Sequence, residues 1–202
     1  MTTICDKFTF PDRVQGENRV NKIDTPTQQT KYIETKSNVN TGYLMFGWLG
    51  PRAAELKPGI CLDLISIIFG DGSSSRLQQN LIEKLPEQIF NMIGSEHYQF
   101  KDGNNFFIQA NFKPEFKEKA LELVKQELAY LLENKITEEE LAKAKKRIKS
   151  RFAFSAETVS EIGETIGYYM TVCENLKLVE DYLADLDSIT LEDLTNTINA
   201  YL

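Results

Sequence analysis

The spacing of apolar residues along this chain changes from strand-like to helix-like, and these changes predict its elements. Residues 1–27 are polar, contain two prolines and show no lasting period, so we expect a polar arm or an interdomain linker there. Residues 28–37 have strand character. The unbroken apolar run over residues 43–49 is typical of a strand that is buried on both faces. We expect residues 28–202 to form a single domain.

Helix and strand signals then follow one another. A helix is expected from Pro58, which is harmless in a first turn, to about Phe69. Residues 76–85 predict a second helix. Residues 89–100 and 104–113 predict two antiparallel strands, because Asp-Gly between them supplies the positive φ of a tight hairpin. Alternate apolar residues of the second strand share one face, namely Phe106, Ile108, Ala110 and Phe112.

The rest of the chain has the helical period. Thr137 with Glu140 forms a candidate capping box, and Thr190 can cap the last helix. The helices carry apolar stripes of the kind that face a core, and one of them comprises Val159, Ile162, Ile166, Tyr169, Met170 and Cys173. This order of elements predicts an α+β fold, a mainly antiparallel sheet with helices packed on one face.

Composition narrows the class of protein. The formal net charge of −7 argues against nucleic acid as a partner, since phosphate binding needs a basic face. No apolar run approaches the ~20 residues of a membrane span, and no signal peptide is visible, so we expect a soluble domain. Cys5, Cys61 and Cys173 have no spacing typical of a zinc knuckle or a disulfide framework, and we expect the last two to be buried.

The residues offer little for catalysis. Hydrolytic zinc sites usually need two or three imidazole or carboxylate ligands at fixed spacing, and this chain has a single histidine, His97. We expect His97 to be a partly exposed sheet residue, and we predict neither a catalytic residue nor a metal ligand. The loop at residues 70–75 precedes a helix, but it lacks a Walker ending, so a C-cap glycine followed by a serine N-cap is favoured over a phosphate site.

The same loop carries a family resemblance. Residues 70–84 resemble the Gly-x-Gly-x-Ser-Ser-Arg-Leu…Arg-Glu-Lys signature of the M16 zinc-peptidase family, in its second, non-zinc half. Further segments follow in the family's order, namely Gln28-Gln29-Thr30, Phe46-Gly47-Trp48-Leu49-Gly50-Pro51 and the helix start Thr137-Glu138-Glu139-Glu140-Leu141. The resemblance spans about residues 28–195.

This resemblance implies one half of a two-halved clamshell. A homologous half with His-x-x-Glu-His would hold zinc, and the two halves would enclose an unfolded peptide. In active members the second half supplies an Arg and, seven residues on, a Tyr that hold the substrate carbonyl. Here Ile82 stands at the Arg position and Ile89 or Phe90 at the Tyr position, and these side chains cannot donate a hydrogen bond.

The sequence therefore predicts a non-catalytic C-terminal half, or a separate subunit, that closes a peptide-binding chamber over a zinc-bearing partner half. We expect no cofactor in this chain. The expected chamber or interface residues are Ser74, Ser75, Arg76, Ile82 and Phe90. A non-proteolytic scaffold or interaction protein on the same fold is the alternative, and an independent ligand-binding α+β domain is a third possibility.

Overall fold

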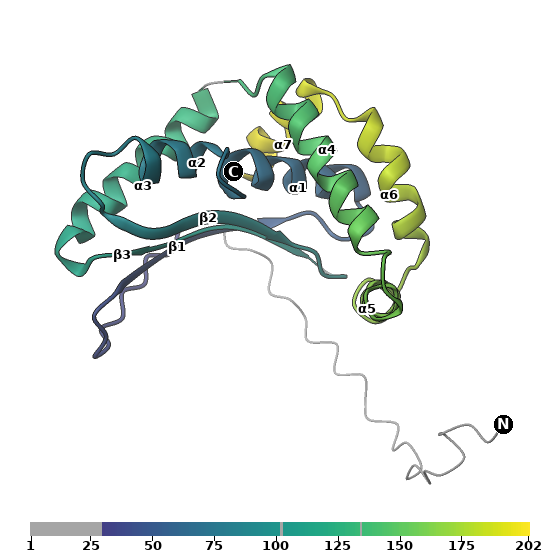
Figure 1. Ribbon diagram of the computed structural model, residues 1–202, viewed down its shortest axis with the longest axis horizontal. Coiled ribbons are helices and arrows are strands. Elements are labelled where there is room, and N and C mark those ends of the chain that lie inside the picture. The colour runs from purple at the N-terminus through teal and green to yellow at the C-terminus, as the bar shows by residue number, and fades with distance from the viewer. Residues whose placement is uncertain (1–29, 102, 134) are drawn as a thin grey trace, which may run out of the picture. The chain divides into compact units, whose positions relative to one another are not determined.

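A three-stranded antiparallel sheet organises the compact unit formed by residues 33–202 (Figure 1). The structure is a computed structural model that describes residues 30–101, 103–133 and 135–202. The expectation for residues 1–27 lies outside the described residues. The strand order is β1-β3-β2, with bounds β1 (Gly42–Gly50), β2 (Phe90–Tyr98) and β3 (Asn104–Phe112). The predicted hairpin of β2 and β3 is thereby confirmed, and β3 pairs with both neighbours.

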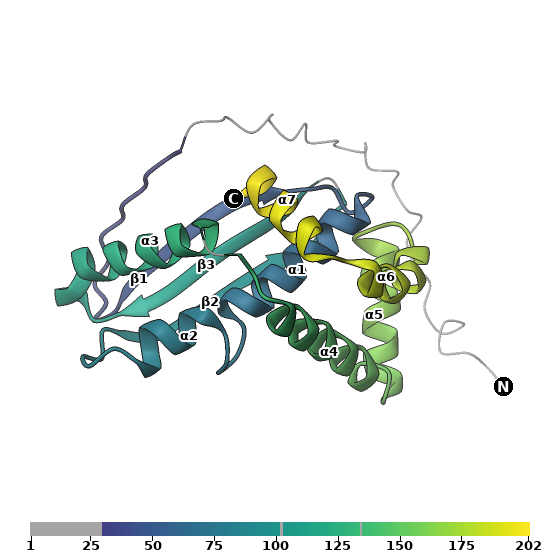
Figure 2. The same ribbon diagram turned by 90° about the horizontal axis from the view of Figure 1, so that it is seen from above.

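Helices cover one face of this sheet. The bounds are α1 (Leu56–Gly70), α2 (Arg76–Gln78) continued by the π-turn η2 (Gln79–Glu83), η3 (Pro114–Phe116), α3 (Lys117–Glu133), α4 (Glu138–Phe154), α5 (Val159–Thr171), α6 (Lys177–Ser188) and α7 (Leu191–Tyr201). Seen from above, α1 lies over the strands with α4 on one side and α7 on the other (Figure 2). The predicted α+β class is confirmed.

The core lies between α1 and the sheet. Phe106, Ile108 and Ala110 of β3 point into it and are almost fully buried, as their alternation predicted. Helix α1 is buried nearly all round, because other helices enclose the sides that the sheet does not cover. Capping boxes at Thr137 and Thr190 begin α4 and α7, which confirms the box predicted at Thr137 and the helix cap predicted at Thr190. Cys61 and Cys173 are buried as expected.

The strand expected over residues 28–37 is not found in its described part, residues 30–37. Two apolar side chains are too few to hold a strand that pairs with no other strand of the described residues. The described sheet ends at β1 on that side.

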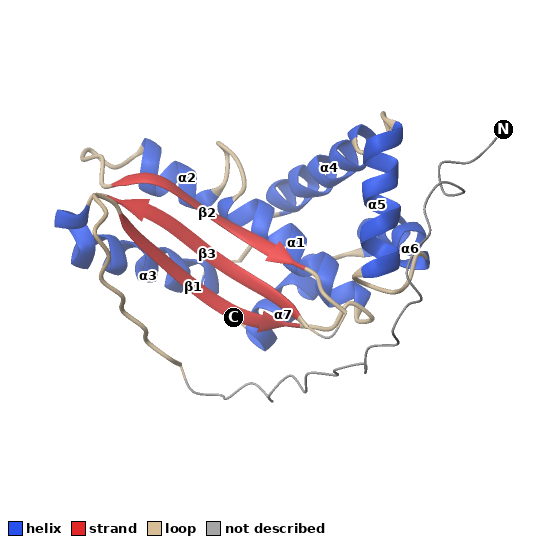
Figure 3. Ribbon diagram, turned by 90° about the horizontal axis from the view of Figure 1, so that it is seen from below, coloured by secondary structure: helices blue, strands red, loops and turns tan. Residues whose placement is uncertain are grey.

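The burial of β1 on both faces was predicted wrongly. Leu44, Phe46 and Trp48 are partly buried and pack against the core. The alternate residues Tyr43 and Met45 point away from the helices and are 69% and 65% exposed. Figure 3 shows this bare side of the sheet. An apolar run predicts burial, but it does not say whether the covering element lies within the same unit.

Helix α5, like the outer face of β1, leaves apolar side chains exposed. Its apolar stripe is present, yet none of its residues is buried within the part of the chain that the structure describes. Among the described residues the stripe is best covered near its end, where Tyr169 packs against a small cluster with Ala53, Cys173 and Leu178. Toward the start of the helix the stripe is open.

Candidate functional site

The turn that carries the family motif depends on the conformation of a glycine and on a hydrogen bond between two of its own residues. Gly72 has φ +93°, a conformation that favours glycine, and a Cβ there would lie 2.2 Å from the Arg147 guanidinium. Ser75 is buried, and its hydroxyl donates to the Gly72 carbonyl at 2.7 Å. Ser74 beside it is exposed. The turn thus places Ser75 inside the protein and Ser74 on the surface.

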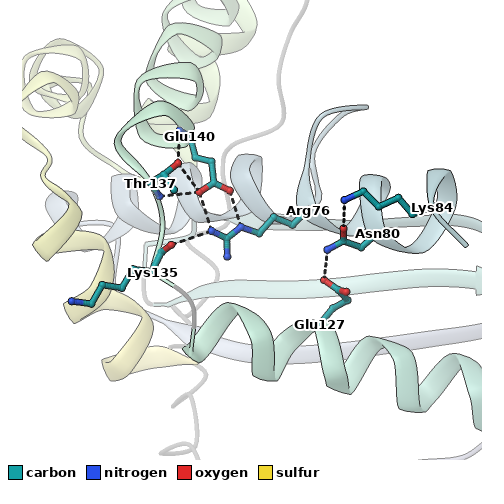
Figure 4. A network of polar contacts seen from close by, with 7 residues as sticks. All are labelled: Arg76, Asn80, Lys84, Glu127, Lys135, Thr137 and Glu140. Atoms are coloured by element: carbon teal, nitrogen blue, oxygen red, sulfur yellow. Dashed lines mark hydrogen bonds and ion pairs between the residues drawn. The ribbon is translucent and has the colours of Figure 1, made fainter.

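Arg76 follows this turn and joins it to the start of α4 (Figure 4). Its Nε donates to Oε1 of Glu140 at 2.7 Å and its Nη2 donates to Oε2 at 2.9 Å. Glu140 also receives the backbone N–H of Thr137 at 2.9 Å, as the reciprocal half of the capping box. A two-point contact between guanidinium and carboxylate is among the stronger polar contacts in proteins.

The pKa values of the pair reflect this contact. The hydrogen bond to Glu140 raises the pKa of Arg76 above its ordinary value. Burial by itself would raise the pKa of Glu140, but the hydrogen bonds from Arg76 and Thr137 outweigh it and leave that pKa lowered. Arg76 therefore connects the serine turn to the Thr137–Glu140 helix start, which is a structural role.

The two positions where the family places its Arg and Tyr hold apolar side chains of the core. Phe90 begins β2 and is 1% exposed, and the alternative position Ile89 is equally buried. Ile82 lies on η2, is partly buried and packs against the same core. The five expected site residues therefore divide. Ser74, Ser75 and Arg76 share one turn, whereas Ile82 and Phe90 contribute to packing.

A hollow lies along β2 at the opposite side of α1 from α7. It has a volume of about 590 Å³ and is lined by residues from β2, β3, α1, α4 and α6, including Asp63, Arg151 and Phe152. A second hollow of about 290 Å³ shares Asp63 and Phe152 and adds Tyr168 and Tyr169 of α5. We call the two together the β2 groove.

A histidine–carboxylate–tyrosine network forms the floor of the β2 groove. His97 as a whole residue is partly exposed, as the sequence suggested, but its side chain is fully buried. Its Nδ1 lies 2.7 Å from Oδ1 of Asp63, and the Tyr182 hydroxyl donates to Oδ2 at 2.6 Å. Because a carboxylate only accepts, Nδ1 of His97 is the donor. Burial and then the Asp63 charge raise the pKa of Tyr182 well above its ordinary range.

This network offers no hydrolytic machinery of its own. Nε2 of His97 has no hydrogen-bond partner among the described residues, so no serine or cysteine there is activated by it. Both oxygens of Asp63 are already engaged. Residues 30–101, 103–133 and 135–202 hold no group of three or more His, Cys, Asp or Glu side chains placed to bind a metal ion, so the described side chains do not fit zinc.

The groove does offer an open strand edge. Within the described sheet β2 pairs only with β3, so its other edge faces the groove. An extended peptide can add to such an edge through main-chain hydrogen bonds. Sequence reasoning missed this site, because Asp63 and His97 are 34 positions apart and no short motif links them.

Every helix of the described residues is too short or too polar to cross a membrane.

Comparison with known proteins agrees with this geometry. The sequence matches the Peptidase M16 inactive domain over residues 4–148. It is 30% identical over 173 residues to an uncharacterized zinc protease of Rickettsia felis, a match that covers 84% of this chain and 41% of that protein. It is also 30% identical over 172 residues to the zinc protease PqqE of Helicobacter pylori, covering 82% of this chain and 37% of that protein.

Solved structures show the same fold. A protease from Helicobacter pylori matches with a TM-score of 0.74 and 26% identity, over 82% of this chain and 40% of that chain. The peptidase M16 inactive domain from Pseudomonas fluorescens matches with a TM-score of 0.68 and 24% identity, over 80% of this chain and 38% of that chain. The chain spans about two fifths of the length of these relatives. It belongs to the peptidase M16 family, as an inactive C-terminal domain of the kind found in its zinc proteases.

Proposed function

We propose that this chain is the non-catalytic half of a two-halved M16 zinc metallopeptidase, and that it helps to enclose an unfolded peptide. One observation carries the non-catalytic part. Ile82 and Phe90, at the positions of the family's Arg and Tyr, are apolar side chains packed in or against the core. Donors directed at a developing oxyanion can contribute roughly 3 kcal/mol to the transition state, and these side chains donate nothing.

Zinc belongs to the partner half in this proposal. The zinc proteases that this chain resembles are more than twice its matched length, so there is room in such proteins for a separate zinc-bearing half. When bound there, zinc would polarise the scissile carbonyl and activate water. The residues described here would contribute shape and peptide contacts.

The β2 groove is the proposed peptide contact of this half. Its open strand edge suits the main chain of an extended peptide, and the buried, unpaired Nε2 of His97 lies at its floor. A polar group of the peptide that reached Nε2 would satisfy this buried nitrogen. The adjoining tyrosines can pack against apolar side chains of the peptide.

The first test is cleavage of an unstructured fluorogenic peptide by the natural assembly purified from its source. We expect cleavage that a zinc chelator abolishes, and a zinc-bearing half with His-x-x-Glu-His in the same chain or in a tightly bound subunit. The isolated chain should cleave nothing, with or without added zinc. An assembly without that half would overturn the proposal and favour the scaffold alternative.

The groove is tested by filling it. Arg151 lines the groove and is 55% exposed, and its partner Asp71 keeps a second ion pair with Arg147. We expect Arg151→Trp in the assembly to raise KM about fivefold or more while kcat stays within about twofold, since ground-state binding alone is impaired. Lys149→Trp on the same helix is the control, because Lys149 lies outside the groove lining and should leave KM unchanged. Equal KM values for both variants would remove the groove from the proposal.

A further inference from the structure

The smaller hollow of the β2 groove has walls of aromatic rings, and we call it the tyrosine hollow. Phe152 of α4 stacks on Tyr182 of α6 with ring centroids 5.2 Å apart. Tyr168 and Tyr169 of α5 meet edge to face with centroids 5.4 Å apart. Its volume of about 290 Å³ lies at the lower end of ligand sites in proteins, which span about 300–1,000 Å³. Such walls and such a size suit one flat ring.

The tyrosine hollow also holds a polar atom that has no partner. His97 lines the hollow with a fully buried side chain, and its Nδ1 donates to Asp63. The other ring nitrogen, Nε2, makes no hydrogen bond within the described residues. A buried polar atom without a partner costs free energy, so a ligand that bonds to Nε2 gains more than a ligand that only fills space.

The polar groups of the hollow indicate which ligand fits. The Asp63 carboxylate lines the hollow and repels an anion. A cation can only donate, and both oxygens of Asp63 already accept hydrogen bonds, from His97 and Tyr182. A neutral hydroxyl both donates and accepts, so it pairs with Nε2 whether or not that nitrogen carries a proton. A ring that bears a hydroxyl group, which is a phenol, therefore suits both the walls and Nε2.

Helix α5 forms the wall that can move. Nε2 of His97 is shielded from solvent in the described structure, so a ligand reaches it only when a lining side chain moves. Helix α5 supplies two of the lining tyrosines and buries none of its own residues within the described chain. The Tyr168 hydroxyl donates to the Gln99 carbonyl and ties the helix to the end of β2. Segments held by few contacts open locally at little cost in free energy.

We propose that the tyrosine hollow is a binding site for a phenol, which displaces the α5 tyrosines, packs between the rings and hydrogen-bonds to Nε2 of His97. The hollow lies within the β2 groove, but the binding of a phenol does not depend on the peptide contact proposed above. A free small molecule and the tyrosyl side chain of a peptide present the same ring and hydroxyl, so the chemistry of the site is the same for both.

The first test compares three ligands of similar size by NMR titration of the isotope-labelled full chain at pH 7. They are p-cresol, p-xylene, in which a methyl group replaces the hydroxyl, and the cation 4-methylbenzylammonium. We expect p-cresol to bind about tenfold or more tightly than p-xylene, because only its hydroxyl pairs with Nε2. Equal affinities would overturn the proposal. Tightest binding of the ammonium would make the hollow a cation site and would overturn it too.

His97→Asn separates the hydrogen bond from the packing. The asparagine amide nitrogen can take the place of Nδ1 and keep the bond to Asp63, whereas nothing takes the place of Nε2. The preference for p-cresol over p-xylene should fall below about twofold, and a retained preference would contradict the role of Nε2. Nuclear Overhauser contacts in wild type locate the ligand without any variant. They should join p-cresol to the rings of Phe152 and Tyr182, and contacts confined to other surfaces would overturn the proposal.

Thr158→Ala tests the movement of α5. Thr158 caps this helix and lines neither hollow, so its loss should favour local opening and leave the site itself intact. We expect p-cresol to associate at least about twofold faster, with its preference over p-xylene unchanged. An unchanged association rate would show that the ligand does not enter past α5.

A peptide distinguishes the two sources of the phenol. An extended peptide with one tyrosine is compared with p-cresol and with the same peptide carrying phenylalanine. Binding about tenfold tighter than both identifies a peptide ligand, and binding no tighter than p-cresol identifies a free phenol, and either result supports the hollow. If no phenol is preferred, the hollow is wrong, while chelator-sensitive cleavage by the natural assembly, and with it the proposed function, can still hold.

Discussion

At the scale of single residues, the contact between Arg76 and Glu140 leads us to predict how the loss of Arg76 changes stability. Both side chains are largely sheltered, with exposures of 13% and 29%. Arg76→Met would leave the Glu140 carboxylate with the capping-box donors alone, and we expect it to lower the free energy of unfolding by about 1–3 kcal/mol. Urea denaturation measures this. Lys119→Met, which breaks an exposed pair with Glu87, is the control and should cost less than about 1 kcal/mol.

The same contact predicts a pH dependence. The pKa of Glu140 is lowered in the folded protein, so its ionised form stabilises the fold above the unfolded pKa of 4.5. That stabilisation is lost as the pH falls through the lower, folded pKa. The cost of Arg76→Met should therefore be full at pH 7 and shrink below 4.5, in urea titrations at several pH values. A cost that is independent of pH would mean that lost packing, and not the ion pair, explains the effect.

At the scale of whole elements, the N-caps of α7 and α5 should contribute differently to the free energy of unfolding. Thr190 and Thr158 cap their helices in the same way, each accepting the backbone N–H three residues on. Helix α7 buries Leu194 and Ile198, whereas α5 buries no residue in the described structure. Thr190→Ala should lower the global free energy of unfolding by about 0.5–2 kcal/mol. Thr158→Ala should instead promote local opening of α5, with little change in global stability.

Hydrogen exchange checks this difference. In the isolated chain the amides of α5 should exchange through local opening, and faster still in Thr158→Ala, while the α7 amides should follow global unfolding. Equal global destabilisation by both substitutions would show that α5 shares the core after all.

The same contrast explains which features could be predicted from the sequence and which could not. Local signals predicted their elements well. Thr137 and Thr190 begin helices, and the turn before Asn104 joins two strands. Burial that depends on distant or external partners was not predictable. The side chain of His97 is buried beside Asp63, which lies 34 positions earlier in the sequence and in turn accepts a hydrogen bond from Tyr182, and no local pattern predicts these contacts. Met45 and Ile166 have core-like spacing, yet they remain 65% and 44% exposed in this unit.

At the scale of the whole molecule, α1 holds the unit together. It lies against the sheet and against α4, α6 and α7, so these elements share one core. The helical segments outside that core, above all α5, are attached through few side chains. Residues 33–202 should therefore unfold as one cooperative body with a loosely coupled α5.

A matched pair of isoleucines tests this arrangement. Ile65 on α1 is fully buried and Ile166 on α5 is 44% exposed, so the same truncation removes the same atoms from opposite environments. Ile65→Ala should lower the free energy of unfolding by about 2–5 kcal/mol in the isolated chain, because a cavity opens in the shared core. Ile166→Ala should change it by less than about 0.5 kcal/mol. If Ile166→Ala destabilised the isolated chain as much as Ile65→Ala, α5 would be a core helix, and its apolar stripe would need no partner.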